Sequence, residues 1–344
     1  MMRRSTLPGR QATLPLPLRR TRLAIAGLLL AVAAFGMPSQ TSAQETKPSN
    51  QTIRLMVTFA PGGGVDVVAR LIAERLTASL GQTVIVENRP GAAGVIAGRQ
   101  VASAEPNGTT VLVASNPLLI NQLLKPETNF KIADELTPVA SVAPQAIVIV
   151  TSPQAPAHSL KDLLTLARQK PLNYATTGAG SLSHLAVEFL LASQPGLRMQ
   201  HVPFPGAAPT LTAVVANQVE VGSATIPPAV PLIKSGKIQA VAVASEQRSA
   251  QLPDVPTFSE AGAPSLPVLA WVGFFVSAKT PKPIVERLSK AIVDAARLPD
   301  VRKKFSEMGF EDKASDSAQF NRELSAELAI WSDVVKKANL VGAN

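Results

Sequence analysis

The chain has 344 residues, a net charge of +9 and no cysteine, so its stability cannot depend on disulfide bonds. One Tyr, two Trp and no clustered basic stripe give little support to nucleic-acid binding. The length is sufficient to bury a large core and exceeds that of a comfortable single domain, so we expect two lobes.

The N-terminal segment has the order of a secretory signal peptide. Arg19, Arg20 and Arg22 precede an apolar run at 23–35, which is followed by small residues ending at Ala43. This run is too short to span a membrane, and we expect export with cleavage near Ala43. The paired arginines leave a twin-arginine route open beside ordinary secretion. The leader carries six arginines and no acid, so it supplies six of the nine net positive charges and the rest of the chain carries +3.

A glycine turn lies between a predicted strand and a predicted helix near the start of the mature chain. Apolar residues alternate over 53–59, whereas they recur at three- and four-residue steps from 65 to 76, before Gly81. Consecutive glycines at this junction allow backbone N–H groups to converge where the helix dipole favours a negative group. We therefore expect this first turn to hold a carboxylate or a phosphate. The residues assigned to it are Phe59, Pro61, Gly62, Gly63, Gly64, Val65 and Asp66.

The same order of strand, loop and helix continues along the next segment. A buried strand is predicted at 83–87 and another strand at 110–114, with a short helix at 95–103 between them. Such alternation predicts a parallel sheet flanked by helices, whose ligands bind beyond the carboxyl ends of the strands. The loop at 88–94 and the residues that follow the 110–114 strand fall at that edge. The additional candidate residues are therefore Ala92, Ser115 and Asn116.

A second α/β block begins after an apolar run that could cross between the lobes. Ser159 and Asp162 predict a capping box at the start of a helix over 160–169. A strand at 173–176 is followed by a second glycine turn at 177–184, which opens a helix that ends near residue 193. Further strands are expected at 199–204, 219–224 and 238–244, and helices at 210–216 and 229–235.

The chain is predicted to cross between the lobes twice. The apolar run at 147–150 leads into the second lobe, and an aromatic-rich strand at 268–277 leads back. Two crossing segments behave as a hinge, so the two glycine turns would face each other across a cleft. Helices expected at 283–296, 299–308 and 317–337 would then pack onto the first lobe. The predicted domains are the signal peptide at 1–43, lobe 1 at 44–147 and 268–344, and lobe 2 at 148–267.

Several polar residues have both a structural and a functional interpretation. Asp66 could cap the helix after the first turn, or contact a ligand through water or an ammonium group. Ser181 could cap its helix with His184 tied to the backbone, or both side chains could contact a ligand carboxylate. A nucleophile at Ser181 has little support, because no Gly-x-Ser-x-Gly elbow surrounds it and no acid is placed to orient His184. Arg89 could form a salt bridge, brace its loop or clamp a carboxylate.

Metal chemistry is not indicated. His158, His184 and His201 are the histidines of the chain, and none of them pairs at ligand spacing. We expect structural roles for His158 and His201. No metal site, cofactor or catalytic residue is therefore predicted.

Five segments resemble the Bug family of periplasmic solute-binding receptors, the extracytoplasmic component of tripartite tricarboxylate transporters. They are 61–66, 86–94, 180–185, 252–257 and 271–273, and the resemblance spans nearly all of the mature chain, in order. The resemblance implies a periplasmic, monomeric receptor without enzymatic activity and with a type II periplasmic binding fold. In that fold two α/β lobes, joined by two crossing strands around a cleft, close on a small organic carboxylate that is delivered to membrane permease subunits. A receptor that senses its ligand and docks on a regulatory membrane partner is the alternative.

The resemblance also implies which loops hold the ligand, largely through backbone N–H groups, small hydroxyls and ordered water. Both glycine turns and the 88–94 loop match the family, and the family's aromatic-lysine-glycine loop falls on 204–206. The second lobe is therefore expected to contribute Thr176, Gly178, Gly180, Ser181, His184, Phe204, Gly206 and Thr225.

The same loops depart from the family at a few positions. Family members commonly have threonine at the position of Val65, tyrosine and lysine at Phe204 and Pro205, and Asp-Asn at Ala224 and Thr225. These differences make the wall of the second lobe less polar. We therefore expect a ligand that is smaller or more apolar than citrate.

Overall fold

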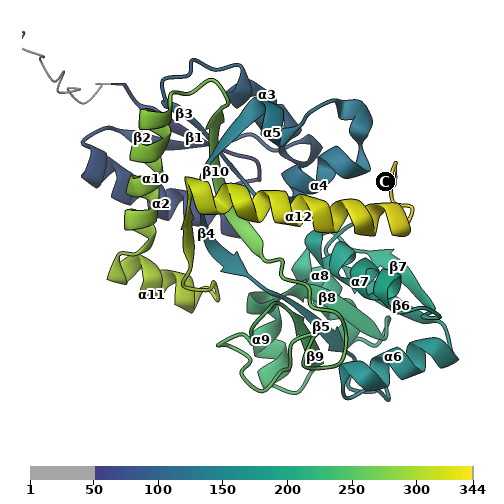
Figure 1. Cartoon of the computed structure of the whole chain (residues 1–344). Helices are drawn as coiled ribbons and strands as arrows, with labels where there is room; N and C mark the ends of the chain where they lie inside the picture. Colours follow the sequence, from purple (N-terminus) through teal and green to yellow (C-terminus); the bar gives the residue numbers. More distant parts are fainter. Residues whose placement is uncertain (1–50, 343–344) are drawn as a thin grey trace, which may run out of the picture. The chain divides into compact units, whose positions relative to one another are not determined.

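The computed structural model of the protein describes residues 51–342 (Figure 1). The predicted signal peptide and its cleavage near Ala43 lie outside these residues. Within this range the strands form two sheets, each accompanied by helices. None of the helices described there combines the length and the apolar character that crossing a membrane requires.

The first sheet has six strands. In spatial order they are β11 (Ala314–Asp316), β4 (Leu136–Gln145), β10 (Ala270–Ser277), β3 (Thr110–Ala114), β1 (Ile53–Val57) and β2 (Val84–Asn88). β1 pairs in parallel with β2 and β3, as predicted, whereas β10 runs antiparallel to β3. The first sheet as a whole is mixed, because β10 returns from the other sheet and pairs antiparallel with both β3 and β4. β2 is partly exposed because it lies at the sheet edge, which differs from the buried strand predicted there.

The helices around this sheet form the first lobe with it. They are α2 (Gly64–Leu80), η1 (Ala92–Gly94), α3 (Val95–Ala102), α4 (Asn116–Leu124), η2 (Pro126–Thr128), α5 (Ile132–Glu135), α10 (Lys282–Ala296) and α11 (Pro299–Glu307). The three- and four-residue spacing in α2 buries Val68, Ile72 and Leu76 in the core of the sheet. α2 ends at Gly81, whose φ of 63° is the left-handed conformation of a glycine stop. The helix and its stop are therefore confirmed.

The second sheet has five strands and, with its helices, forms the second lobe. Its strands are, in spatial order, β7 (Met199–Pro203), β6 (Leu172–Thr176), β8 (Val221–Thr225), β5 (Ile147–Thr151) and β9 (Gln239–Ala244). Its helices are α6 (Leu160–Gln169), α7 (Leu182–Ser193), α8 (Ala207–Val215) and α9 (Ile226–Lys234). The predicted capping box of α6 is confirmed, because Ser159 Oγ accepts the Asp162 N–H at 3.1 Å and the Asp162 carboxylate accepts the His158 N–H at 3.2 Å.

The chain passes between the two sheets twice, as predicted. β4 of the first sheet leads through Ala146 into β5 of the second, and the segment 245–269 leads from β9 back to β10 (Figure 1). β5 runs antiparallel to both β8 and β9, since it arrives from the other lobe. The two-lobed α/β fold with two crossing strands is thereby confirmed, while the exact lobe boundaries stay predictions.

The last helix, α12 (Ser317–Lys337), packs on both lobes. Its first half contributes Phe320 to an apolar cluster of the first lobe, and its second half contributes Trp331 and Val335 to the core of the second lobe. Ile120 of α4 joins that second core, next to residues of α7 such as Leu185. Figure 1 shows α12 crossing the molecule beside α4 and above α7. Two helices therefore connect the lobes in addition to the crossing strands.

A buried carboxylate lies where α4, α12 and the returning strand meet. Glu327 is 5% exposed and accepts hydrogen bonds from Asn116 Nδ2 at 2.6 Å, Trp271 Nε1 at 2.7 Å and Trp331 Nε1 at 2.9 Å. Asn116 also accepts the Trp271 N–H and donates to the Leu269 carbonyl, both at 3.1 Å. Burial raises the pKa of Glu327 to about 7, although the three N–H donors act in the opposite direction. Glu327 thus ties the first turn of α4 to β10 and α12.

We expect Glu327→Leu to lower the free energy of unfolding by about 2–5 kcal/mol, because two buried indole N–H groups lose their acceptor and each unpaired donor costs about 1–3 kcal/mol. Chemical denaturation followed by tryptophan fluorescence measures this change. Glu286→Leu on α10, whose side chain is 63% exposed, is the control and should shift stability by no more than about 0.5 kcal/mol. Equal losses of stability in both variants would contradict the structural role given to Glu327.

Candidate functional site

Residues 177–181 of the second glycine turn are held by hydrogen bonds within the loop itself. Gly178 and Gly180 have φ of 132° and 70°, values that favour glycine. Ser181 Oγ caps α7 by accepting the His184 N–H at 3.2 Å, and it donates to the Gly178 carbonyl at 2.7 Å. The structural interpretation of Ser181 as a helix cap is therefore confirmed.

His184 braces this turn from the inside of the second lobe. Its Nδ1 accepts the Gly180 N–H at 3.1 Å, which requires the proton to be on Nε2. Nε2 lies 3.6 Å from Glu188 Oε1, and the Tyr174 hydroxyl donates to the same oxygen. Burial acts to raise the pKa of Glu188, but hydrogen bonds from His184 and Tyr174 outweigh it and lower the pKa. A partly buried, ionised glutamate therefore lies beside the Nε2–H of the tautomer that receives the Gly180 N–H.

His201 supports the same turn from the neighbouring strand. Its ring stacks on His184 with the ring centroids 3.8 Å apart, and its Nε2 lies 2.7 Å from Thr176 Oγ1. Burial lowers the pKa of His201 to about 4, and the adjacent His184 adds to this effect. His201 is therefore neutral near pH 7, in line with the structural role predicted for it.

A cavity of about 400 Å³ lies between this turn and the first lobe. The first lobe contributes the start of η1, one face of α4 and the residues after it, so the cavity is bounded by both lobes. Its lining includes a lysine and no acidic side chain in the part of the chain described. The lining residues are Ala92, Ala93, Pro117, Asn121, Leu124, Lys125, Thr128, Thr177, Gly178, Ala179, Gly180 and Ser181.

The first-lobe wall of this cavity has an unusual backbone. Ala92 and Ala93 have φ of 45° and 53°, so two consecutive residues with side chains adopt the left-handed conformation. Gly91 and Gly94 flank them with φ of 137° and 98°. Such strain costs about 1–3 kcal/mol per residue and is characteristic of binding loops. Ala92, predicted as a site residue, therefore lies in a strained loop at the cavity.

The two lobes touch at the base of the cavity. A Cβ built on Gly180 would lie 2.5 Å from Leu124 Cδ1, so a larger residue there would have to displace the Leu124 side chain. Gly178 approaches the Phe204 carbonyl instead, where a Cβ would have 3.8 Å of space. Gly180 is thus the contact between the second turn and the first lobe.

The first glycine turn has a different environment. None of the residues 59–66 is among those that line the cavity between the lobes. Asp66 is 2% exposed and accepts bonds from Arg70, from Asn88 Nδ2 at 2.7 Å and from the Gly62 N–H at 2.9 Å. Burial acts to raise the pKa of Asp66, but these bonds outweigh it and lower the pKa to about 2. Asp66 therefore stabilises the turn, and a ligand role for Phe59, Gly63 and their neighbours stays a prediction.

Other predicted site residues lie at strand ends. Ser115 is the N-cap residue of α4, and the side chain of Asn116 bonds to protein groups around Glu327. Phe204 and Gly206 follow β7, where the Phe204 N–H donates to the Thr176 carbonyl at 3.0 Å. These positions are compatible with the predicted edge of the sheets, and their contact with a ligand stays a prediction. Thr225 is the N-cap residue of α9.

The sequence analysis predicted neither helix α4 nor its contribution to the lining of the cavity. Asn121, Leu124, Lys125 and Thr128 line the cavity, yet no element was predicted between 117 and 145. The signal was present: a serine followed by Asn-Pro opens the helix, and apolar residues at 118–120 and 123–124 surround a polar Asn121.

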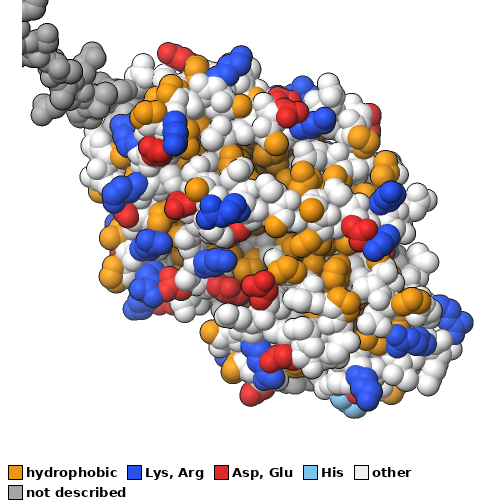
Figure 2. Space-filling view, in the orientation of Figure 1, with side chains coloured by type: hydrophobic (Ala, Val, Ile, Leu, Met, Phe, Trp, Pro, Cys, Tyr) orange, Lys and Arg blue, Asp and Glu red, His pale blue; other side chains and the backbone are white. Residues whose placement is uncertain are grey.

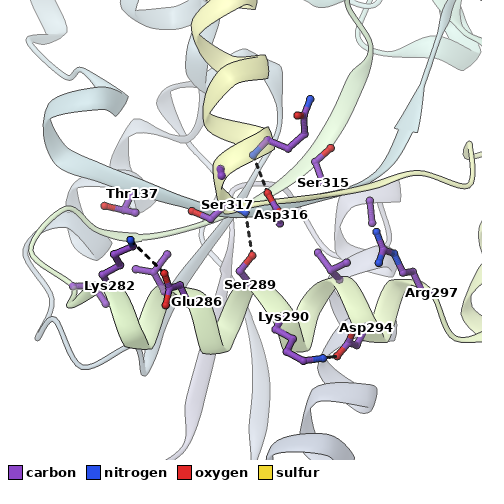
Figure 3. A pocket seen from close by; sticks show the side chains of 16 residues that line it. Thr137, Lys282, Glu286, Ser289, Lys290, Asp294, Arg297, Ser315, Asp316 and Ser317 are labelled. Carbon is purple, nitrogen blue, oxygen red and sulfur yellow. Dashed lines mark hydrogen bonds and ion pairs between the residues drawn. The ribbon is translucent and has the colours of Figure 1, made fainter.

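A larger cavity, of about 820 Å³, lies along α10 and has a different character (Figure 3). It runs along α10 below the start of α12. Four of its charged side chains form ion pairs along α10, Lys282 with Glu286 and Lys290 with Asp294. Figure 2 shows acidic and basic side chains interspersed over this side of the first lobe. None of the predicted site residues lines this cavity.

Comparison with known proteins identifies a family and relatives to which this chain is similar. A family described as the tripartite tricarboxylate transporter family receptor matches residues 68–340. Protein BugT of Bordetella pertussis is 30% identical over 319 residues, which cover 92% of this chain and 96% of BugT.

Two solved structures are similar over the described fold. Rpa4515 of R. palustris, solved with adipate, is 30% identical with a TM-score of 0.72, covering 84% of this chain and 97% of that one. MatC of Rhodopseudomonas palustris, solved with bound malate, is 32% identical with a TM-score of 0.68, covering 83% and 98%. Both similarities extend over nearly the whole length of the compared proteins.

We expect Gly180→Ala to destabilise the protein more than Gly196→Ala, by about 1–3 kcal/mol. Both glycines have positive φ, but only Gly180 faces Leu124, whereas a Cβ at Gly196 would meet open space. Thermal and chemical unfolding measure the difference. Adding Leu124→Ala should recover part of the loss in the Gly180 variant. Strictly additive effects of the two substitutions would show that this contact does not exist in solution.

We expect the free energy of unfolding to fall as the pH decreases from 6.5 to 4 through the contribution of His201. The unfolded chain protonates this histidine near pH 6.5, whereas the folded protein does so only near pH 4, so acid favours unfolding in this window. Denaturant titrations of the wild type and His201→Gln at several pH values isolate the effect, since both share all other titrating groups. The stability advantage of the wild type over His201→Gln should shrink toward pH 4, and a constant difference would contradict this.

Proposed function

Because the chain belongs to the family of tripartite tricarboxylate transporter receptors, we propose that it captures a small organic carboxylate and delivers it to the permease subunits of such a transporter. This membership confirms the resemblance that the five sequence segments indicated. Proteins of the family are periplasmic binding proteins, and we further propose that a signal peptide cleaved near Ala43 exports this chain.

The observation that carries the proposal is the cavity bounded by both lobes. The N-terminus of α7 opens onto it through residues 177–181, and Lys125 adds a positive charge from the first lobe. Backbone N–H groups at a helix start and a lysine both favour a negatively charged guest. The related structures hold adipate and malate, which are small carboxylates, and this supports the assignment of the ligand class.

The proposed mechanism is closure of the lobes on the ligand. A carboxylate in the cavity would contact α4 and the η1 loop on one side and the second turn on the other. Because these groups belong to different lobes, the ligand binds the closed arrangement more tightly and shifts the population toward it. The contact between Gly180 and Leu124 lies at the same seam, and would form as the lobes close. A permease could then recognise the closed receptor.

We also propose that the protein has no catalytic turnover. The single candidate chemistry in the sequence was a nucleophilic Ser181 activated by His184. His184 Nδ1 already accepts the Gly180 N–H, and its Nε2 points to Glu188, so neither nitrogen is placed to take the proton of Ser181. The serine hydroxyl itself donates to the Gly178 carbonyl. These contacts position the turn for binding.

We expect mono- and dicarboxylates to raise the melting temperature of the purified protein, and their amides to leave it unchanged. A ligand at one hundred times its Kd adds about 2.7 kcal/mol to the stability of the bound fold. Differential scanning fluorimetry with matched pairs such as succinate and succinamide, or adipate and adipamide, makes the comparison. Lys125→Gln should reduce the stabilisation by the acids, whereas Lys237→Gln, at a lysine outside the cavity lining, should leave it unchanged. Equal stabilisation by acids and amides would refute readout of a carboxylate.

A further inference from the structure

A buried serine outside the cavity lining joins the two ends of the second glycine turn. Ser183 lies in the first turn of α7 and is 2% exposed. Its Oγ accepts the Thr177 N–H at 3.0 Å and lies 2.9 Å from both Thr177 Oγ1 and Ser181 Oγ. Thr177 and Ser181 are the first and last residues of the turn at 177–181, and both line the cavity, whereas Ser183 does not. Ser183 is therefore placed to act on the wall of the cavity through its neighbours.

The direction of these hydrogen bonds follows from the position of one proton. A serine or threonine hydroxyl has a single hydrogen to donate. Ser181 donates its hydrogen to the Gly178 carbonyl at 2.7 Å, so Ser183 must be the donor to Ser181. Since Ser183 has then used its own hydrogen, Thr177 must be the donor to Ser183. The hydroxyl protons of these three residues all point along one chain into the protein, and none of them is left for a guest.

Ser183 uses its full hydrogen-bonding capacity in this chain. Its Oγ donates one hydrogen bond and accepts two, from the N–H and the O–H of Thr177. Replacing it by an apolar residue would deprive both Thr177 groups of this acceptor. At the other end of the chain, Ser181 Oγ accepts the His184 N–H at 3.2 Å. The hydroxyl of Ser183 thus fastens the start of the turn to the cap of α7.

We propose that Ser183 is a positioning residue for ligand binding, which holds the second turn in the conformation that presents backbone N–H groups to a carboxylate. This inference rests on the proposed function and adds to it a residue that does not itself contact the ligand. Because the hydroxyl protons of the turn point into the protein, the donors that remain for an anion are backbone N–H groups. Their directions depend on the conformation of the turn, so a support behind it contributes to affinity.

The first test measures binding of propionate, succinate and adipate to the purified protein by isothermal titration calorimetry. Ser183→Ala should raise the Kd of each acid that binds the wild type by about tenfold, because two donors of Thr177 lose their acceptor. Ser289→Ala on α10 is the matched control: Ser289 is 4% exposed, accepts the Ser317 N–H at 3.0 Å and is not among the residues that line this cavity. The control should keep each Kd within about twofold of the wild-type value.

Amide hydrogen exchange of the ligand-free protein, followed by NMR, tests the support of the turn without a ligand. The Thr177 N–H bonds to a buried oxygen, so its exchange should be at least about tenfold faster in Ser183→Ala than in the wild type. Ser289→Ala should leave this rate within about twofold of the wild-type value, which separates a local effect on the turn from a general loss of stability.

The outcomes separate this inference from the proposed function. Unchanged exchange at Thr177 in Ser183→Ala, unchanged binding of an acid that binds the wild type, or equal effects in Ser289→Ala overturns the positioning role and leaves the function in place. No binding of any of the three acids to the wild type overturns both. If Ser183→Ala does not fold, Thr177→Val, which removes the hydroxyl that begins the chain, takes its place in the binding comparison with the same expected rise in Kd.

Discussion

The arrangement of the molecule depends on a single buried carboxylate and its three N–H donors. Glu327 is held by Asn116 at the start of α4, by Trp271 on the strand that returns from the second lobe, and by Trp331 in α12. Ionised or not, this group has no other way to be satisfied in an apolar surrounding, so the three elements must meet there. The direction of α4 follows from this junction, and with it the position of Asn121 and Leu124 at the cavity. A structural constraint far in sequence from the glycine turns therefore decides the first-lobe wall of the site.

The second-lobe wall of the cavity depends on the polar side chains behind it. Glu188, His184 and His201 support a turn of small residues. Glu188 lies beside one nitrogen of His184, and the other nitrogen of His184 receives the N–H of Gly180. His201 contributes to this support because its ring stacks on His184 and its Nε2 lies near Thr176 Oγ1. His184, for which ligand contact was one of two interpretations, and His201, for which a structural role was predicted, both support the turn. The surface that remains for a guest consists of backbone and small side chains, which suits an anion held by N–H groups.

Prediction from the sequence succeeded where the cause of a structure is local. The cap at Ser181, the capping box at Ser159 and the stop at Gly81 each depend on residues within four positions, and all three are present. Prediction failed where a structure depends on residues that are distant in the chain. The role of Asn116 in α4 was not predicted, because it depends on Glu327, which lies more than two hundred residues further along the chain.

Outside the segment 116–145, the sequence alone determined most of the secondary structure, and it also determined the two crossings between lobes and the family, because periodic burial, helix caps and ordered motifs are properties of neighbouring residues. Only the tertiary structure decided which of the expected site residues share one cavity. It joined Ala92 to the second turn, engaged Asp66 and Asn116 in bonds to the protein, and brought α4 and α12 across both lobes. The physical reason is that hydrogen-bond satisfaction and packing are set by groups that are far apart in the chain and adjacent only after folding.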